Sequence, residues 1–302
     1  MTLYDAVRDI LEQQIRQMTG TIPGVIADLD PEPLHDFRVA ARRMRAVLNQ
    51  VKPAIDPVQR RELARIIQEM AAMTNTKRDL DVFMESVPSM AALIPDDMQH
   101  ELSLFRRRIA RRRLLESRRI IAVFCSEAFR IDITRIESMI VKSGAILPGP
   151  GASLSVDTFA KDRIAKRCRR VVRDGRSIRR GILDHQMHAF RIQCKKFRYL
   201  LEFFTPVFSD IDVHDPIRRL KTLQTLLGDY NDISVQVAMI QCELTHNRRL
   251  TPAAAAMLNT LTRELQDKKD GMLIKIRRVF RIFLQGCRPV LAGSAGGKGA
   301  VR

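Results

Sequence analysis

The sequence is poor in aromatic side chains. It contains no Trp and 3 Tyr, and aromatic residues make up 5% of its 302 positions. Proteins that bind single-stranded nucleic acid by stacking need exposed aromatic platforms, so this composition disfavours that mode of binding. The hydrophobic residues, at 45%, suffice for a core. That core is expected to be aliphatic, with Phe and Met filling irregular gaps.

Paired cysteines and long apolar runs are also missing. The 5 Cys are scattered and none forms a Cys-x-x-Cys pair, which argues against a disulfide framework and favours a reducing compartment. No uncharged run reaches the roughly 18 apolar residues of a membrane-spanning helix. Residues 1–8 lack the basic-then-apolar layout of a secretory signal. We therefore expect a cytoplasmic protein.

Acidic residues are too few to balance the basic ones. Lys and Arg number 52 against 34 Asp and Glu, which leaves a net charge of +18. Such an excess makes a compact fold repel itself unless an anion binds, and nucleic acid, inorganic phosphate chains and acidic lipid all qualify. A solvated, Arg-rich surface without any partner is the alternative that composition leaves open.

One segment of the chain occurs twice. The sequence HDFRVAARRMR at 35–45 returns as HAFRIQCKKFR at 188–198, an offset of 188 − 35 = 153 residues, and the match continues without a gap to 78–82 and 231–235. An ungapped match of this length indicates two copies of one structural unit. Between the copies, the Gly- and Pro-rich stretch at 143–153 is typical of a linker.

Apolar periodicity and the Pro positions predict helices almost throughout and no strand. In the first half we expect helices over about 1–18, from 35 to near 53, over 57–74, from 79 to near 87, and from 96 into the 120s. The second half is expected to restart the order at 156–183, 188–206, 213–227 and from 232 onward, with a break near 251–252. The prediction is an all-α fold of two four-helix bundles related by internal duplication, 1–142 and 156–290, within one domain of 1–290. Residues 143–155 are the expected linker and 291–302 a disordered tail.

The repeated segment gathers a histidine and cations on one side of its helix. At about 100° per residue, these side chains form a stripe roughly 80° wide in each copy. The stripes consist of His35, Arg38, Arg42 and Arg45 in the first copy and His188, Arg191, Lys195 and Arg198 in the second, with Arg43 and Lys196 at one flank. The opposite face carries Phe37, Met44, Leu48 and Val51, and in the second copy Phe190, Phe197, Leu201 and Phe204.

This arrangement points to an anion. Like charges at these spacings repel one another, whereas an anion would accept the forked hydrogen bonds of Arg and the point charge of Lys. Neighbouring cations should lower the pKa of each histidine and keep it neutral, able to donate one N–H. A solvated basic face with a capping or core histidine is the competing interpretation. Ten basic residues between 161 and 180, among them Lys166, Arg170 and Arg173, are expected to support the same surface.

Two aspartates, Asp79 and Asp232, are also matched between the copies. Each lies where a helix is expected to begin, so capping, or pairing with a nearby Arg, is the prediction. A catalytic or metal-binding role is the alternative.

The motif His-x-x-Arg-x-x-x-basic-basic-x-Arg, present twice in a helical chain, resembles the conserved histidine α-helical domain family, CHAD. KRDLDV at 77–82 and LLGDYNDISV at 226–235 resemble that family's later motif. The resemblance implies two bundles related by a pseudo-twofold axis, with basic helices facing a central groove or pore. It also implies binding of inorganic polyphosphate without catalysis, and we expect no metal or cofactor. The sequence leaves open whether the protein associates with polyphosphate granules. Carried over by position, the binding residues are His35, Arg38, Arg42, Arg43, Arg45, His188, Arg191, Lys195, Lys196 and Arg198.

Two other functions remain open at this point. A basic helical protein that binds nucleic acid fits the charge, although no helix-turn-helix spacing or set of zinc ligands supports it. An enzyme on phosphate polymers would need carboxylates that hold a divalent metal, or an activated nucleophile. The basic stripes contain neither, so we expect at most an accessory subunit that brings a partner enzyme to polyphosphate.

Overall fold

The computed structural model describes residues 1–142, 145–178, 182–205 and 214–287. The all-α prediction is confirmed, because these residues form helices and no strand, apart from two isolated bridges. None of the described helices is long and apolar enough to cross a membrane. The expected tail at 291–302 lies outside the described residues.

The helices of the two halves follow a similar order. They are α1 (Leu3–Gly20), α2 (Ile22–Ala27), α3 (Glu32–Gln50), the 3-10 turn η1 (Lys52–Ala54), α4 (Pro57–Met73), α5 (Asn75–Ala91), the turn η2 (Asp96–Met98), α6 (Gln99–Phe124), α7 (Glu127–Val141), α8 (Val156–Arg176), α9 (Asp184–Phe204), α10 (His214–His246) and α11 (Pro252–Gly286). The starts of α1 and α8, and those of α6 and α11, are 153 residues apart (156 − 3 and 252 − 99). The order is therefore compatible with a duplication, which itself stays a prediction.

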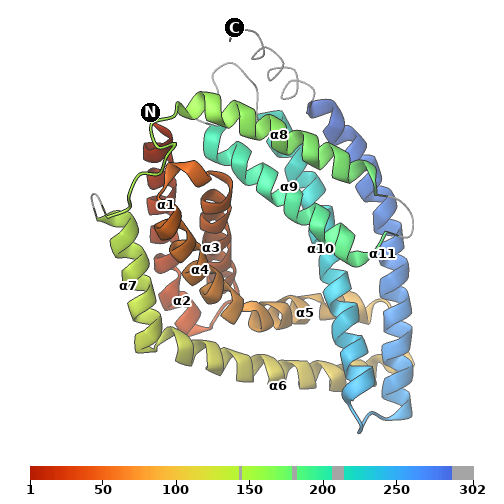
Figure 1. Ribbon diagram of the computed structural model, residues 1–302. Coiled ribbons are helices and arrows are strands. Elements are labelled where there is room, and N and C mark those ends of the chain that lie inside the picture. Colours follow the sequence, from red (N-terminus) through yellow and green to blue (C-terminus); the bar gives the residue numbers. More distant parts are fainter. Residues whose placement is uncertain (143–144, 179–181, 206–213, 288–302) are drawn as a thin grey trace.

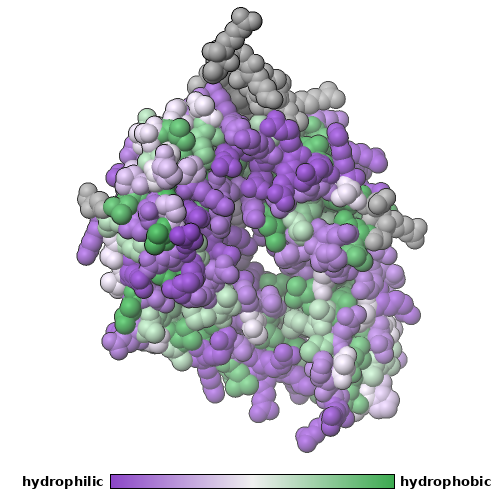
Figure 2. Space-filling model, viewed as in Figure 1, coloured by the Kyte–Doolittle hydropathy of each residue, from purple (hydrophilic) through white to green (hydrophobic). Residues whose placement is uncertain are grey.

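The helices are arranged as a ring (Figure 1). One side consists of α1 to α4 with α7, the top of α8 and α9, the other side of α10 and α11, and the bottom of α5 and α6. The halves meet where α3 contacts α9 and where α5 and α6 contact α10 and α11. An opening with hydrophilic residues on its upper rim lies near the middle of the molecule (Figure 2). The polar faces of α3 and α9 are thus brought together.

The apolar faces of the repeated helices pack into the core, as predicted. Phe37 and Met44 of α3 and Phe197 and Phe204 of α9 are fully buried. Elsewhere, helix ends follow capping chemistry: the Asp56 carboxylate accepts the N–H groups of the first turn of α4. Each apolar face thereby orients the basic residues on the other side of its helix.

Several helix boundaries differ from the prediction: α8 ends at Arg176 and not near 183, α9 begins at Asp184 and not at 188, and the boundaries expected at the matched aspartates are displaced. Helix α5 begins at Asn75 rather than near Asp79, and α10 runs without interruption through Asp232. The expectation that these aspartates cap helices is therefore wrong. In the first half, Thr74 separates α4 from α5 and turns its hydroxyl back onto the Ala71 carbonyl. In the second half the matched position is Leu227, which is buried inside α10 and lets the helix continue.

The expected linker packs against the first half where the structure describes it. The N–H of Gly149 donates to the Ala54 carbonyl at 3.0 Å, and that of Gly151 donates to the Pro53 carbonyl at 2.8 Å. A Cβ atom on Gly149 would lie 2.5 Å from the Ile55 oxygen, so only glycine allows this approach. Residues 145–155 therefore form a strap over η1.

Candidate anion-binding site

The basic residues of the repeated helices surround the point where α3 and α9 meet. The Gln50 side chain of α3 donates to the Lys196 carbonyl of α9 at 3.0 Å and ties the two helices together. Nine of the ten predicted site residues are half-buried here, and His188 is exposed. Their environments divide them into several groups with different partners.

A central cluster consists of Arg42, Arg191 and Lys195. Among the described residues, none accepts a hydrogen bond from these three side chains or pairs with them. The buried Nε atoms of Arg42 and Arg191 lack any acceptor. The pKa of Lys195 is lowered from 10.5 to about 6. Burial is the largest cause, the positive charges of Arg42, Arg191 and Arg198 add to it, and Asp232 opposes the shift. The cluster therefore holds uncompensated positive charge and donors without acceptors.

Arg38 is held differently from its counterpart Arg191. Its Nη1 donates to the Ala71 carbonyl at 3.0 Å and to the Thr74 hydroxyl at 2.6 Å. These contacts satisfy the end of α4, so Arg38 supports the break before α5. Burial lowers the pKa of Arg38, and Arg42 adds to the effect. Arg191 makes no such contact among the described residues, and Asp232 of α10 is a nearby opposite charge.

The two histidines also have unequal neighbours. Burial lowers the pKa of His35, and Arg78 and Arg42 lower it further, while Glu32 opposes them. The prediction that neighbouring cations lower a histidine pKa is thus confirmed for His35. At His188 the ring Nδ1 lies 2.7 Å from the Asn231 side-chain oxygen. Arg78 and Asn231 are matched at the offset of 153 residues, which explains why the two rings differ.

Asp79 and Asp232 lie on the acidic side of this region. Burial raises the pKa of Asp79 and nearby Asp232 adds to the rise, while Arg38 and Arg78 lower it. Neither carboxylate forms an ion pair within the usual distance with a described residue. The expected pairing with a nearby arginine is therefore not seen as an ion pair. Asp232 is still close enough to Arg191 and Lys195 to oppose the lowering of their pKa values.

The remaining stripe residues lie on two flanks of the crossing. On one flank, Glu202 pairs with Arg43 at 2.9 Å and with Arg198 at 3.5 Å, and both guanidinium groups contact the ring of Tyr199. One carboxylate thus compensates part of the charge of this flank, and its arginines stabilise the contact between α3 and α9.

On the other flank, the cations pair with no carboxylate of the residues that the structure describes. Arg45 donates to the Gln68 side-chain oxygen at 3.2 Å. Burial lowers the pKa of Lys196, and Arg167, Arg170 and Arg45 lower it further. This flank is therefore as uncompensated as the central cluster.

A cationic pocket, the α8 pocket, adjoins this flank. It has a volume of about 430 Å³ between the end of α3, α8 and α9, and no carboxylate is among the described residues that line it. The cations that line it are Lys52, Arg163, Lys166, Arg167 and Arg170. Of the predicted supporting residues, Lys166 and Arg170 are thus in place, whereas Arg173 lies outside, 74% exposed and 3.1 Å from Asp174.

Three cations of this pocket were missing from the sequence-based set. Arg163 and Arg167 follow the three- and four-residue spacing of Lys166 and Arg170 on α8, so helical periodicity could have identified them. Lys52 lies beyond the end of α3, and no local pattern predicts that it reaches α8.

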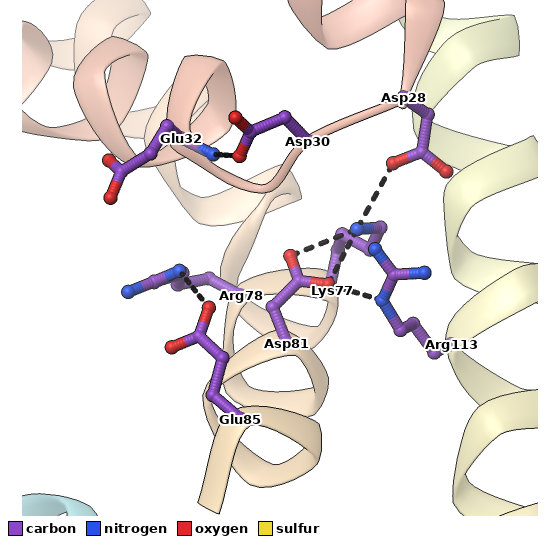
Figure 3. A network of polar contacts seen from close by, with 8 residues as sticks. All are labelled: Asp28, Asp30, Glu32, Lys77, Arg78, Asp81, Glu85 and Arg113. Carbon is purple, nitrogen blue, oxygen red and sulfur yellow. Dashed lines mark hydrogen bonds and ion pairs between the residues drawn. The ribbon is translucent and has the colours of Figure 1, made fainter.

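A buried ionic network fixes the position of α5 beside the cluster (Figure 3). Lys77 is 2% exposed and binds Asp81 at 2.7 Å and Asp28 at 3.2 Å. Arg113 of α6 donates to the same Asp81 oxygen at 2.6 Å. The network joins the end of α2, α5 and α6. The neighbouring Arg78 lies 3.4 Å from Glu85 (Figure 3) and is close enough to His35 to lower its pKa.

Comparison with known proteins agrees with this architecture. The family model of the CHAD domain matches residues 9–241. The chain is similar to PptA from Streptomyces chartreusis, with a TM-score of 0.73 and 14% identity over 94% of this chain and 100% of that one. It is also similar to the CHAD domain from the plant Ricinus communis, with a TM-score of 0.70 and 20% identity over 100% of this chain and 93% of that one. A search of curated proteins found no match.

Proposed function

The chain belongs to the CHAD domain family, and we propose that it binds inorganic polyphosphate without catalysing a reaction. The central cluster carries this proposal. Arg42 and Arg191 bring positive charge and unpaired donors together from both halves of the chain, and the amine of Lys195, whose pKa is lowered to about 6, lies beside them. An anion with several adjacent phosphates would satisfy these donors and remove the repulsion between the cations.

Several features favour a polymer of phosphates over a single small anion. Unpaired, buried Nε atoms occur at five arginines along the crossing. These arginines belong to the central cluster and to both flanks of the crossing. The unpaired set consists of Arg42, Arg43, Arg45, Arg191 and Arg198. A repeating anion without bases matches such a row of donors.

A nucleic acid is the second candidate, because the net charge of +18 allows it. Binding of single strands would use aromatic side chains as stacking platforms. Among the described residues, none of the large apolar side chains that are fully exposed is aromatic. We therefore expect nucleic acid to bind more weakly than polyphosphate at physiological salt.

An enzyme on phosphate polymers is the third candidate. Among the described residues, Glu32, His35 and Asp36 are the group whose ligand atoms are close enough to hold a metal ion. Glu32 and Asp36 are exposed, and the second copy has His185 and Ala189 in their places. Neither carboxylate belongs to the central cluster, so we favour a binding role, in which the protein presents polyphosphate to other proteins or associates with polyphosphate granules.

Calorimetry with long-chain polyphosphate at about 0.15 M salt, with RNA of equal total charge as competitor, tests the proposal. The double variant Arg42→Gln/Arg191→Gln should lose most of the affinity. A matched control, Arg107→Gln/Arg118→Gln, removes the same charge from exposed, unpaired positions on α6. It should retain affinity close to that of the unchanged protein.

We expect binding that weakens steeply with salt, as counterion release requires, and that RNA does not displace. Equal losses in the double variant and its control would mean that net charge, and not the cluster, binds the polymer. Ready displacement by RNA would put nucleic acid in first place.

A further inference from the structure

The two flanks of the α3–α9 crossing differ at one matched position. Glu202 pairs with both Arg43 and Arg198 on the first flank and compensates one of their two charges. The position 153 residues earlier is Asn49, whose side chain donates to the Arg45 carbonyl and carries no charge. The second flank, with Arg45 and Lys196, therefore lacks the carboxylate that compensates the first.

The helices that adjoin the flanks differ in the same direction. Helix α8 offers Arg163, Lys166, Arg167 and Arg170 to the α8 pocket. At the matched positions, 153 residues earlier, helix α1 carries the uncharged residues Ile10, Gln13, Gln14 and Gln17. A cationic pocket therefore adjoins the second flank, and the sequence provides no equivalent of it beside the first.

The cations of the α8 pocket and of the second flank form one electrostatic unit. Lys196 is close enough to Arg167, Arg170 and Arg45 for all three to lower its pKa. Within the pocket, Arg170 and Arg163 lower the pKa of Arg167, although burial is the larger cause. A path of cations thus leads from the central cluster over the second flank into the pocket.

Some of this charge is already balanced. Asp162 lies 2.8 Å from Lys166, and Asp174 lies 3.7 Å from Arg170. Both pairs span one turn of α8 at its exposed surface, where such pairs contribute little and exchange readily with other partners. Neither aspartate lines the pocket, so the cations inside it remain available to an anion.

We propose that the α8 pocket is a second polyphosphate subsite. A bound chain leaves the central cluster past Lys196 and Arg45 into this pocket, and not past the flank where Glu202 pairs with the arginines. This inference rests on the proposed function and adds a direction and a length requirement to it. From Arg42 to the end of α3 at Gln50 the helix spans eight residues, or about 12 Å, and Lys52 lies beyond it. A tripolyphosphate is shorter than this and occupies the central cluster alone. A long chain reaches both subsites.

A triple variant of the pocket tests the length requirement. Arg163→Gln/Lys166→Gln/Arg170→Gln removes three cations that lie at the surface of α8. Arg107→Gln/Arg111→Gln/Arg118→Gln removes the same charge from exposed positions on α6 and serves as the control. Affinities for long-chain polyphosphate and for tripolyphosphate are measured by calorimetry with both variants, after their melting temperatures are shown to match that of the unchanged protein.

The pocket variant should lose at least about tenfold more affinity for the long chain than the control, the effect of roughly one charge-assisted hydrogen bond. Its affinity for tripolyphosphate should equal that of the control. Equal losses of long-chain affinity in the two variants would overturn the second subsite. A larger loss for tripolyphosphate than for the long chain would also overturn it, because the pocket would then be the primary site.

A single-charge pair of variants tests the direction independently. Asn49→Glu places a carboxylate where the other flank has Glu202, and Gln13→Glu adds the same charge at an exposed position on α1. Asn49→Glu should weaken long-chain binding several-fold more than Gln13→Glu; equal effects would overturn the direction. If the unchanged protein binds neither long-chain polyphosphate nor tripolyphosphate, the proposed function fails. If it binds both, but each variant loses the same long-chain affinity as its control, only the second subsite fails.

Discussion

Binding of polyphosphate should be coupled to uptake of a proton by Lys195. In the free protein this amine is half-buried among Arg42, Arg191 and Arg198, with Asp232 of α10 as the opposing charge, and its pKa is about 6. It is therefore mostly neutral at neutral pH. A phosphate chain in the central cluster adds negative charge beside the amine and returns its pKa toward the ordinary value of 10.5.

The size of the effect follows from the two pKa values. At pH 8 the free amine is about 99% neutral, whereas the bound amine is protonated, so each binding event takes up nearly one proton. The association constant should fall about tenfold for each unit of pH above 7 and become independent of pH below about 6. The internal phosphates of a long chain stay ionised across this range and do not contribute.

Calorimetry at pH 8 in two buffers with different ionisation enthalpies measures the proton uptake directly. Lys195→Met should abolish most of it and flatten the pH dependence. His35→Gln is the control, because burial and Arg78 also lower the pKa of His35; it should remove a smaller share. Uptake that is absent in the unchanged protein, or undiminished in Lys195→Met, would refute the argument.

Three further predictions concern stability and the flank that carries Glu202. Unfolded lysine binds more protons than folded Lys195 between pH 6 and 10.5, so the free energy of unfolding rises with pH across this window. The variant Lys195→Met should lack this rise, and its free energy of unfolding at pH 7, measured by denaturant titration, should exceed that of the unchanged protein by at least about 2 kcal/mol. Lys77→Met breaks the buried network and should cost about 3–5 kcal/mol in the same assay, and a loss below 1 kcal/mol would contradict the network's role. Glu202→Gln removes the ion pairs of two arginines and should strengthen long-chain binding a few-fold in calorimetry. Weaker binding would mean that those arginines stabilise the fold and do not bind the polymer.

The sequence was sufficient for the helices and for the orientation of the repeated motif. Periodicity placed Phe37 and Phe197 in the core, and both are fully buried. Because each helix buries its apolar face, the positions of Arg42 and Lys195 on the opposite side follow from spacing alone. Local chemistry of this kind does not depend on the rest of the fold, which is why it could be predicted.

Partners that come from distant segments could not be predicted in this way. Arg38 and Arg191 are equivalent in the motif, yet Arg38 is used to cap α4 because Thr74 interrupts the helix there. Whether a stripe arginine meets a carboxylate depends on Glu202, which reaches back across the crossing to Arg43. The motif therefore predicts a set of cations but not which of them are available to a ligand.

Availability is what separates a binding site from a basic surface in a chain with a net charge of +18. A cation that pairs with a carboxylate or caps a helix already stabilises the free protein, and a ligand gains little by replacing that contact. Arg42 and Arg191 have no such partner, and Lys195 avoids their repulsion by releasing its proton. The fold thus tolerates the central cluster because one of its three basic groups, Lys195, stays deprotonated until an anion binds. Affinity for the polymer and the pH dependence of binding should accordingly change together in variants of this cluster, and separately in variants of the α8 pocket.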